Sequence, residues 1–116
     1  MDNQVVAKRH ELIARLHELT NNNALTWKVT PIDYGVQCAF ADYVVRLGLA
    51  NNGDTYMAVC DKDGKPMDTI SAKELLTETG KLNSSDQLKE LYKTARSQAH
   101  GVEQALDSIL STLSNL

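Results

Sequence analysis

The segment that decides the fold runs from Tyr34 to Cys60 and reads YGVQCAFADYVVRLGLANNGDTYMAVC. Apolar residues alternate with polar or small residues along it, and turn-forming residues interrupt the alternation twice. A period of two places successive side chains on opposite faces of a β-sheet, so each uninterrupted run predicts a strand. The segment therefore predicts three consecutive strands, over residues 34–40, 43–49 and 56–60.

Turn residues indicate how these strands connect. Ala41-Asp42 gives a short connection, and the stretch from Asn51 to Asp54 carries the Asn-Gly signal of a tight hairpin. Asn and Gly both accept a positive φ at low cost, which such hairpins require. Asp61-Lys62-Asp63-Gly64 then turns the chain again. Because the strands follow one another closely, an antiparallel meander is the simplest topology.

One further strand is predicted on each side of this segment. Residues 25–30 alternate between apolar and polar side chains until Pro31 removes a backbone donor. Residues 67–70 form a short fifth strand, and we expect it at an edge of the sheet because Pro66 precedes it. The meander should therefore contain five strands.

Amphipathic helices are expected before and after the meander. The N-terminal helix has an apolar stripe that consists of Val5, Leu12, Leu16 and Leu19, with Ile13 beside them. It should end at residues 21–23, because asparagine tolerates left-handed and turn geometry. Ser71 and Glu74 match a capping box and Gly80 supplies a stop, which predicts a short helix over residues 72–79.

The terminal helix gives the strongest periodic signal, and Ser84 with Gln87 repeats the capping pattern at its start. Its apolar stripe consists of Leu88, Leu91, Tyr92, Ala95, Ala99, Val102, Leu106, Ile109, Leu110, Leu113 and Leu116. A straight helix over residues 88–116 would extend roughly 42 Å, whereas a compact chain of this length is about 35 Å across. Either the helix breaks near His100-Gly101, where glycine costs roughly 1 kcal/mol relative to alanine, or another chain covers the overhanging stripe.

Charged residues flank this stripe in an order that suits a two-fold pair. In two antiparallel copies centred near Gln98, Lys89 would face Asp107 of the partner subunit, and Lys93 would face the partner's Glu103. The alternative is that these are ordinary solvated side chains, since exposed pairs contribute at most roughly 1 kcal/mol. The expected interaction surface consists of Lys89, Lys93, Arg96, Glu103, Asp107, Leu110, Leu113 and Leu116.

Composition excludes several classes of protein. The net charge of -3 is too small to indicate a nucleic-acid-binding surface, and only Lys28 and Arg46 are positive on the predicted strands. No apolar run approaches the roughly 18 residues of a membrane span, and the N-terminus leads into a mixed-charge helix rather than a signal peptide. We therefore expect residues 1–116 to form one α+β domain in the cytoplasm, without nucleic-acid or membrane partners.

Candidate metal and thiol chemistry is weak. Cys38 and Cys60 fall inside predicted strands and are expected to be buried free thiols. His10 and His17 share a helical face, but roughly 10 Å of helix separates them, too far to chelate one metal ion. Asp61 to Gly64 differs from a calcium loop, because its glycine comes fourth rather than sixth. No metal or cofactor is expected.

Enzyme motifs are also missing: the sequence has neither a glycine-rich phosphate loop nor a Gly-x-Ser-x-Gly elbow. Aspartates near the predicted strand ends leave one enzymatic alternative, although aspartate is also a common turn residue. These residues are Asp33, Asp42, Asp54, Asp61 and Asp63. We expect a protein that is not an enzyme, and no substrate follows from the aspartates.

Two stretches resemble those of small bacterial or phage α+β proteins: Leu25-Thr26-Trp27-Lys28, which opens the meander, and Leu88-Lys89-Glu90-Leu91-Tyr92, which opens the final helix through Gly101-Val102. The similarity covers most of the chain and carries no catalytic residue with it. In size, mild acidity and lack of motifs, the chain is also similar to phage-encoded inhibitors of bacterial defence such as anti-CRISPR proteins. The resemblance implies a phage or mobile-element inhibitor of a bacterial complex.

The overlong stripe favours a non-enzymatic protein-interaction module that acts through the terminal helix or the exposed face of the sheet. We expect a protein partner, or a homodimer formed through the terminal helix. The alternative is a small-molecule binding module with a pocket between sheet and helices, near Trp27, Tyr34 and Tyr43.

Overall fold

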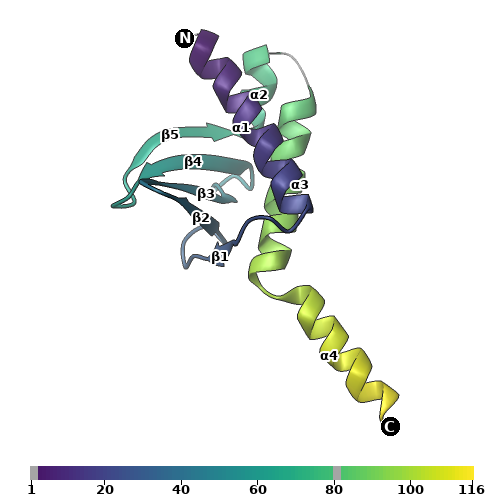
Figure 1. Ribbon diagram of the computed structural model, residues 1–116. Helices are drawn as coiled ribbons and strands as arrows, with labels where there is room; N and C mark the ends of the chain where they lie inside the picture. Colours follow the sequence, from purple (N-terminus) through teal and green to yellow (C-terminus); the bar gives the residue numbers. More distant parts are fainter. Residues whose placement is uncertain (1–2, 80–81) are drawn as a thin grey trace.

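The computed structural model describes residues 3–79 and 82–116. Within them, one helix precedes a five-stranded sheet and three helices follow it (Figure 1). The elements are α1 (Asn3–Asn21), β1 (Lys28–Val29), β2 (Val36–Phe40), β3 (Tyr43–Leu49), β4 (Thr55–Asp61), β5 (Pro66–Ser71), α2 (Ala72–Thr79), α3 (Leu82–Ala99) and α4 (Val102–Ser114). The helices lie on one side of the sheet, which confirms the predicted α+β class.

The sheet is the predicted antiparallel meander, with the strand order β1-β2-β3-β4-β5. Its register aligns Val36, Leu47, Met57 and Ile70 in one row across β2 to β5. All four side chains are buried, because alternate residues of each strand face the helices. β5 lies at an edge, as Pro66 predicts.

The predicted strand over residues 25–30 is confirmed only at Lys28–Val29. Trp27 is instead buried in the core, where its indole Nε1 donates a hydrogen bond to Thr20 Oγ1 at 3.0 Å. The predicted start of the second strand at Tyr34 is also wrong. Asp33 and Tyr34 both have left-handed backbone angles, with φ of 56° and 51°, so they belong to the loop before β2.

Of the three predicted connections, Ala41-Asp42 joins β2 to β3 as expected, and the other two differ in outcome. The Asn-Gly connection is a five-residue loop from Ala50 to Asp54 rather than a tight two-residue hairpin, and Gly53 alone in it has a positive φ, of 84°. The Asp61 turn is confirmed: its Oδ1 accepts the backbone N–H groups of Asp63 and Lys65 at 2.9 and 3.0 Å. This aspartate satisfies donors that the turn would otherwise leave unpaired.

The core lies between the sheet and the pair formed by α1 and α3. From α1 it receives Ile13 and Leu16, together with the methyl-bearing side chain of Thr20. Leu12 packs partly buried against this core, whereas Val5, the first residue of the predicted stripe, is exposed. The apolar residues that α3 contributes to the core are Leu88, Leu91, Tyr92, Ala95 and the partly buried Ala99.

Of the two predicted helix caps, only the first is confirmed. The backbone N–H of Glu74 donates to Ser71 Oγ at 3.1 Å, and that of Ser71 donates to Glu74 Oε1 at 3.2 Å. Ser84 does not cap a helix, because α3 already begins at Leu82. Gly80, the predicted stop, lies outside the described residues.

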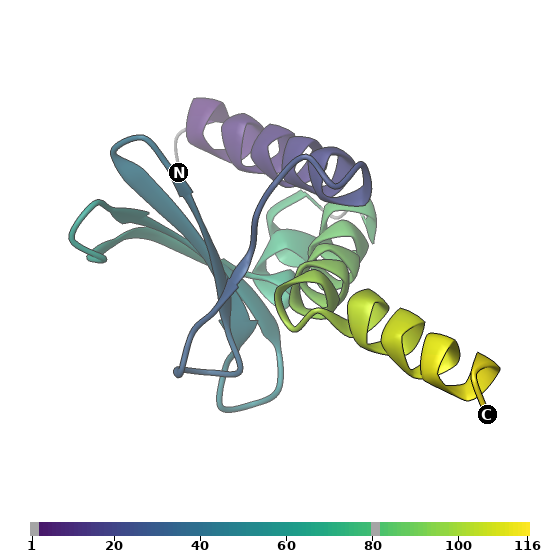
Figure 2. The ribbon, with the colours of Figure 1, turned by 60° about the horizontal axis from the view of Figure 1, so that its bottom comes forward.

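The terminal helix is broken at Gly101, one of the two solutions that its length allowed. α3 ends at Ala99 and α4 begins at Val102, and Gly101 between them has a left-handed φ of 64°. α4 then projects away from the domain (Figures 1 and 2). The principal extents are 60 × 32 × 28 Å, so the long axis far exceeds the width expected for a compact chain of this length. No described helix is both long and apolar enough to cross a membrane.

Candidate protein interaction surface

α4 exposes an apolar stripe that nothing in the described chain covers. No residue of this helix is buried, and its large apolar side chains are between 42% and 61% exposed. We define the α4 stripe as Val102, Leu106, Ile109, Leu110 and Leu113. Leu116, which follows the helix, is 95% exposed. Contiguous exposed apolar side chains of this kind mark interaction sites in folded proteins.

The spacing of the stripe explains why α4 is amphipathic. Its members recur at i, i+4, i+7, i+8 and i+11, which places them on one face of a helix. Ser108 and Ser111 lie on the opposite face. A helix of thirteen residues is marginally stable alone in water, because nucleation is costly and few hydrogen bonds repay it. Burial of the stripe against another surface would stabilise the helix.

The elbow before α4 is set by local backbone geometry. The N–H of His100 donates to Arg96 O at 3.0 Å, and the N–H of Gly101 donates to Gln98 O at 3.1 Å, which closes the end of α3. Gly101 then adopts the left-handed conformation that glycine tolerates best. The carbonyl of Gly101 accepts the N–H of Ala105 at 3.0 Å and so begins α4.

Beside α3 lie two adjoining open hollows of about 670 and 430 Å³, which share Tyr92 and Lys93 in their linings. We call them together the basic groove. Its lining consists of Asn52, Gly53, Asp54, Thr55, Lys73, Lys89, Tyr92, Lys93, Arg96, Ser97, His100 and Val102. The basic side chains outnumber the single carboxylate of Asp54, so the groove has a positive potential.

The predicted basic residues of the interaction surface lie along this groove. Lys89 and Lys93 are exposed. Arg96 is half-buried, and its guanidinium carbon lies 5.4 Å from the centre of the Tyr34 ring. It also donates to the hydroxyl of Tyr92 at 3.3 Å, and that hydroxyl donates to Tyr34 O at 2.6 Å. Arg96 therefore has a role within the chain, which Lys89 and Lys93 lack among the described residues.

The predicted acidic and apolar residues lie apart from these, on α4. Glu103 and Asp107 are exposed beside the stripe, and Leu110, Leu113 and Leu116 are exposed as well. Within the described chain, no ion pair joins the acidic pair to the lysines of α3. The structure therefore brings the lysines together along α3 and the acidic residues together along α4. Lys93 and Glu103 line one hollow at the elbow, but no ion pair joins them.

Sequence reasoning missed part of this surface. Val102, Leu106 and Ile109 fit the periodic pattern, yet the pattern does not show that these residues are exposed while those of α3 are buried. Gly101 is the local signal that divides the two halves. Residues 52–54 of the loop, Thr55 at the start of β4 and Lys73 of α2 reach the groove through tertiary structure, and no local sequence signal marks them.

A second polar constellation joins α1 to β5, α2 and α3. Arg9 binds Asp68 through two hydrogen bonds, of 2.7 and 2.6 Å, and donates to Glu78 at 2.8 Å. Hydrogen bonding to Asp68 is the largest cause that raises the pKa of Arg9. His10 Nε2 lies 3.2 Å from Glu78 Oε1, and its Nδ1 contacts Ser84 Oγ.

This Ser-His-Glu series has the order of a nucleophilic triad, but its geometry favours a structural role. Ser84 is buried, and Glu78 is shared between His10 and Arg9. None of these residues lines the basic groove or the hollow at the elbow. The constellation joins α1 to three consecutive elements that are far from it in sequence, β5, α2 and α3.

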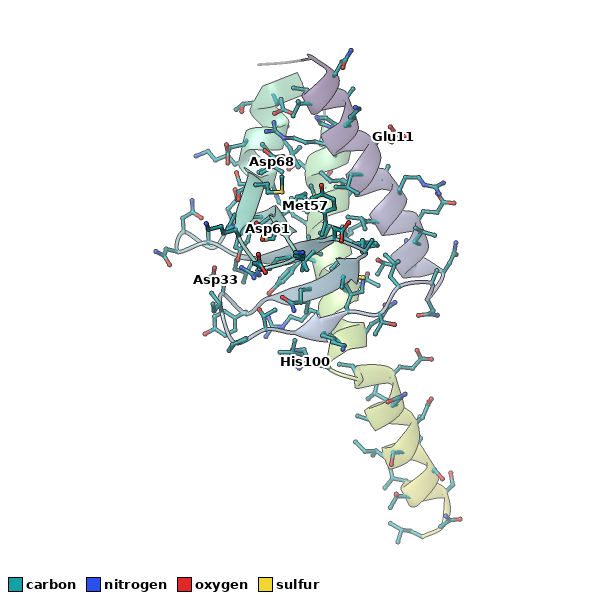
Figure 3. The ribbon with its side chains drawn as sticks, turned by 60° about the vertical axis from the view of Figure 1, so that its left-hand side comes forward. Glu11, Asp33, Met57, Asp61, Asp68 and His100 are labelled. Carbon is teal, nitrogen blue, oxygen red and sulfur yellow. The ribbon has the colours of Figure 1, made fainter. Side chains whose placement is uncertain are left out.

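The strand-end aspartates have structural partners. Asp33 Oδ2 accepts the Tyr56 hydroxyl at 2.8 Å, and burial together with this hydrogen bond raises the pKa of Tyr56 to about 12. Asp54 Oδ2 accepts the backbone N–H of Lys73 at 3.1 Å. Asp33 bonds to Tyr56 near the start of β4, whereas Asp61 is the last residue of the strand, roughly 17 Å from Tyr56 along it, so the two aspartates form no carboxylate pair. Figure 3 shows Asp33 and Asp61 on the sheet side of the molecule, away from α4.

The cysteines and histidines form no shared site. Cys38 and Cys60 are free and buried, as predicted, and the register places them on opposite faces of the sheet. Burial raises the pKa of the Cys38 thiol. His17 Nε2 lies 3.1 Å from Glu90, whereas His10 contacts Glu78. Among residues 3–79 and 82–116, no group of three or more potential metal ligands occurs.

A third hollow, of about 700 Å³, lies at the elbow. It is lined by the chain before β1, including Trp27, and by residues of α3 and α4. Tyr34 and Tyr43, which the small-molecule alternative placed beside Trp27, are not part of this lining. One wall of the hollow belongs to α4, so its shape depends on the direction in which α4 leaves the elbow.

Comparison with known proteins adds no family assignment. The chain matches no protein-family model, no curated protein and no solved structure. The function of the chain is therefore inferred from the geometry and chemistry of α4 and the basic groove.

Proposed function

We propose that this chain is a non-enzymatic protein-interaction module whose binding element is α4. One observation carries the proposal: α4 projects from the domain with every residue accessible and an apolar stripe along one face. An amphipathic helix that inserts its apolar face into a groove is a common mode of protein recognition. In this mode the i, i+4, i+7 and i+8 positions supply the anchoring side chains.

The stripe can stabilise such a complex, but only to a modest degree. Complete burial of a leucine-sized side chain is worth roughly 1.5 to 3 kcal/mol. Because the side chains of the α4 stripe are between 42% and 61% exposed, covering each one adds about 1 kcal/mol. Association costs at least about 4 kcal/mol in lost freedom of motion. The stripe therefore supports modest affinity, and a tighter complex requires further contacts beside α4.

An inhibitor of a bacterial complex, the role that the sequence resemblance implies, would use the same element. A helix that projects from a small domain can enter a groove on a larger assembly and exclude another ligand from it. This role is a prediction about the partner, and the binding element is the same for any protein partner.

A double substitution on each face of α4 tests the proposal. Leu106→Asp with Leu110→Asp places two charges in the stripe, and Ser108→Asp with Ser111→Asp places two charges on the opposite face. We expect the first variant to lose the complexes of the wild type, as measured by sedimentation of the purified protein and by affinity capture from a cell lysate. The second variant should retain them, and both should keep the thermal stability of the core.

The proposal fails if the stripe variant keeps every complex that the wild type forms. It also fails if the wild type forms no complex in either measurement. Circular dichroism of both variants separates lost binding from lost folding, because α1, α2 and α3 contribute most of the helical signal.

A further inference from the structure

We propose that the partner of α4 is a second copy of this chain, and that each copy places its α4 antiparallel in the basic groove of the other. This inference rests on the proposed function, because it assumes that α4 is the binding element. It names the partner and the surface that receives the helix.

Charge complementarity is the first argument. Glu103 and Asp107 are the charged residues of α4, and the helix has no basic residue. The basic groove contributes Lys73, Lys89 and Lys93 as exposed ammonium groups. An α4 helix packed against a second α4 would leave both acidic pairs without a basic partner. The groove supplies the missing charge, which favours it over a pairing of two α4 helices.

The spacing of the charges is the second argument. Lys89 and Lys93 lie one turn apart on α3, and Glu103 and Asp107 lie one turn apart on α4. An antiparallel helix that sets Glu103 beside the partner's Lys93 therefore sets Asp107 beside the partner's Lys89. Both lysines are exposed and make no ion pair among the described residues, so the new pairs break none.

Length is the third argument. α4 has thirteen residues and is therefore about 20 Å long. α3 has eighteen residues, so it is long enough to support the whole of a partner's α4. In the antiparallel register, residues 102–107 of α4 lie over residues 94–89 of the partner's α3, which border the basic groove, and residues 108–114 extend over residues 88–82 at the start of that helix. Val102 and Leu106 thus lie over the groove while Glu103 and Asp107 face the lysines.

The direction of α4 makes the exchange reciprocal. The helix projects away from the domain at the elbow (Figures 1 and 2), and of its residues only Val102 lines the groove of its own chain. A two-fold axis near the elbow would fill both grooves at once and close the assembly as a dimer. Two strips about 20 Å long and 10 Å wide bury roughly 800 Å² in total, which is typical of a weak interface. The dimer should therefore depend on protein concentration.

Charge reversal tests the pairing directly. Lys93→Glu and Glu103→Lys each oppose like charges at both symmetric contacts, so each should raise the dissociation constant of the dimer about tenfold. The double variant restores opposite charges across the two-fold axis and should return to nearly the wild-type dissociation constant. Lys62→Glu, in the turn before β5, is the matched control for a changed net charge. Sedimentation equilibrium over a range of protein and salt concentrations measures all four.

Three results would overturn the inference. The wild type could be a monomer at every concentration, the single variants could dimerise as well as the wild type, or the double variant could be weaker than either single variant. If the wild type is a monomer while Leu106→Asp with Leu110→Asp abolishes capture of another protein, the proposed function stands and the homodimer is wrong. If neither self-association nor capture occurs, both fail.

Discussion

Two leucine truncations on the terminal helices should have opposite consequences, although both residues belong to one periodic stripe in the sequence. Leu91 of α3 is fully buried, whereas Leu110 of α4 is 61% exposed. Replacing a buried leucine by alanine costs about 2 to 5 kcal/mol, because the change removes apolar contacts and leaves a cavity. An exposed position away from the core changes stability by about 0.5 kcal/mol or less.

We therefore expect Leu91→Ala to lower the free energy of unfolding of the dilute protein by about 2 to 5 kcal/mol. Leu110→Ala should leave it nearly unchanged under the same conditions. At protein concentrations where α4 is covered, Leu110→Ala should weaken association by about 1 to 2 kcal/mol. This is the part of the burial free energy of a leucine side chain that remains to be gained, because Leu110 is 61% exposed in the free chain. This contrast distinguishes a helix that is buried in its own domain from a helix that is buried only in a complex.

Urea unfolding measures both effects, with far-UV circular dichroism for the helices and fluorescence of Trp27, the single tryptophan, for the core. The slope of free energy against urea should be the same for the wild type and both variants, because neither change alters the surface that unfolding exposes by much. Equal destabilisation by the two variants in dilute solution would refute the reasoning. It would mean that α4 packs on its own domain.

Thr20→Val should lower the free energy of unfolding by about 1 to 3 kcal/mol, because it leaves the buried Trp27 Nε1 without its acceptor. Thr20→Ser keeps the acceptor and is the control. Equal stability of the two variants in urea unfolding would contradict the role of this hydrogen bond. The raised pKa of Tyr56, about 12 against an ordinary value of 10, means that the folded state holds this proton more tightly than the unfolded state does. The resulting stability is complete below about pH 10 and is lost as the pH rises towards 12. Tyr56→Phe should remove this alkaline loss from a series of thermal melts, and an unchanged profile would show that other groups cause it.

Most of the fold follows from local pattern. Alternation with a period of two is strong from Val36 to Cys60. Here β3 has its predicted bounds, β4 is one residue longer at each end than predicted, and β2 begins two residues late because Tyr34 lies in a loop. The departures have tertiary causes. Trp27 lies outside the expected first strand because its indole N–H donates to the buried hydroxyl of Thr20. Tyr34 lies outside the expected second strand because its carbonyl accepts the hydroxyl of Tyr92.

The candidate site was predictable as a stripe but not as a surface. Leu91 and Leu110 have the same periodic setting, yet α1 and the sheet cover the first and nothing described covers the second. Coverage depends on Ile13 and Leu16, which are far away in sequence. Gly101 marks the boundary in the sequence. A glycine inside a helical pattern is compatible with a continuous helix as well as with a break, however, so the sequence alone does not decide between them. The basic groove depends on a loop that approaches α3 only in the folded chain.

The elbow at Gly101 makes α4 a lever arm. For a rigid arm about 20 Å long, a rotation of about 10° at the elbow moves the far end by about 3.5 Å, close to the width of one side-chain contact. The backbone angles of one residue therefore determine which surfaces the tip of α4 can reach. A β-branched residue at this position would disfavour the left-handed φ and redirect the arm. Binding could then be lost while every side chain of the α4 stripe stays in place.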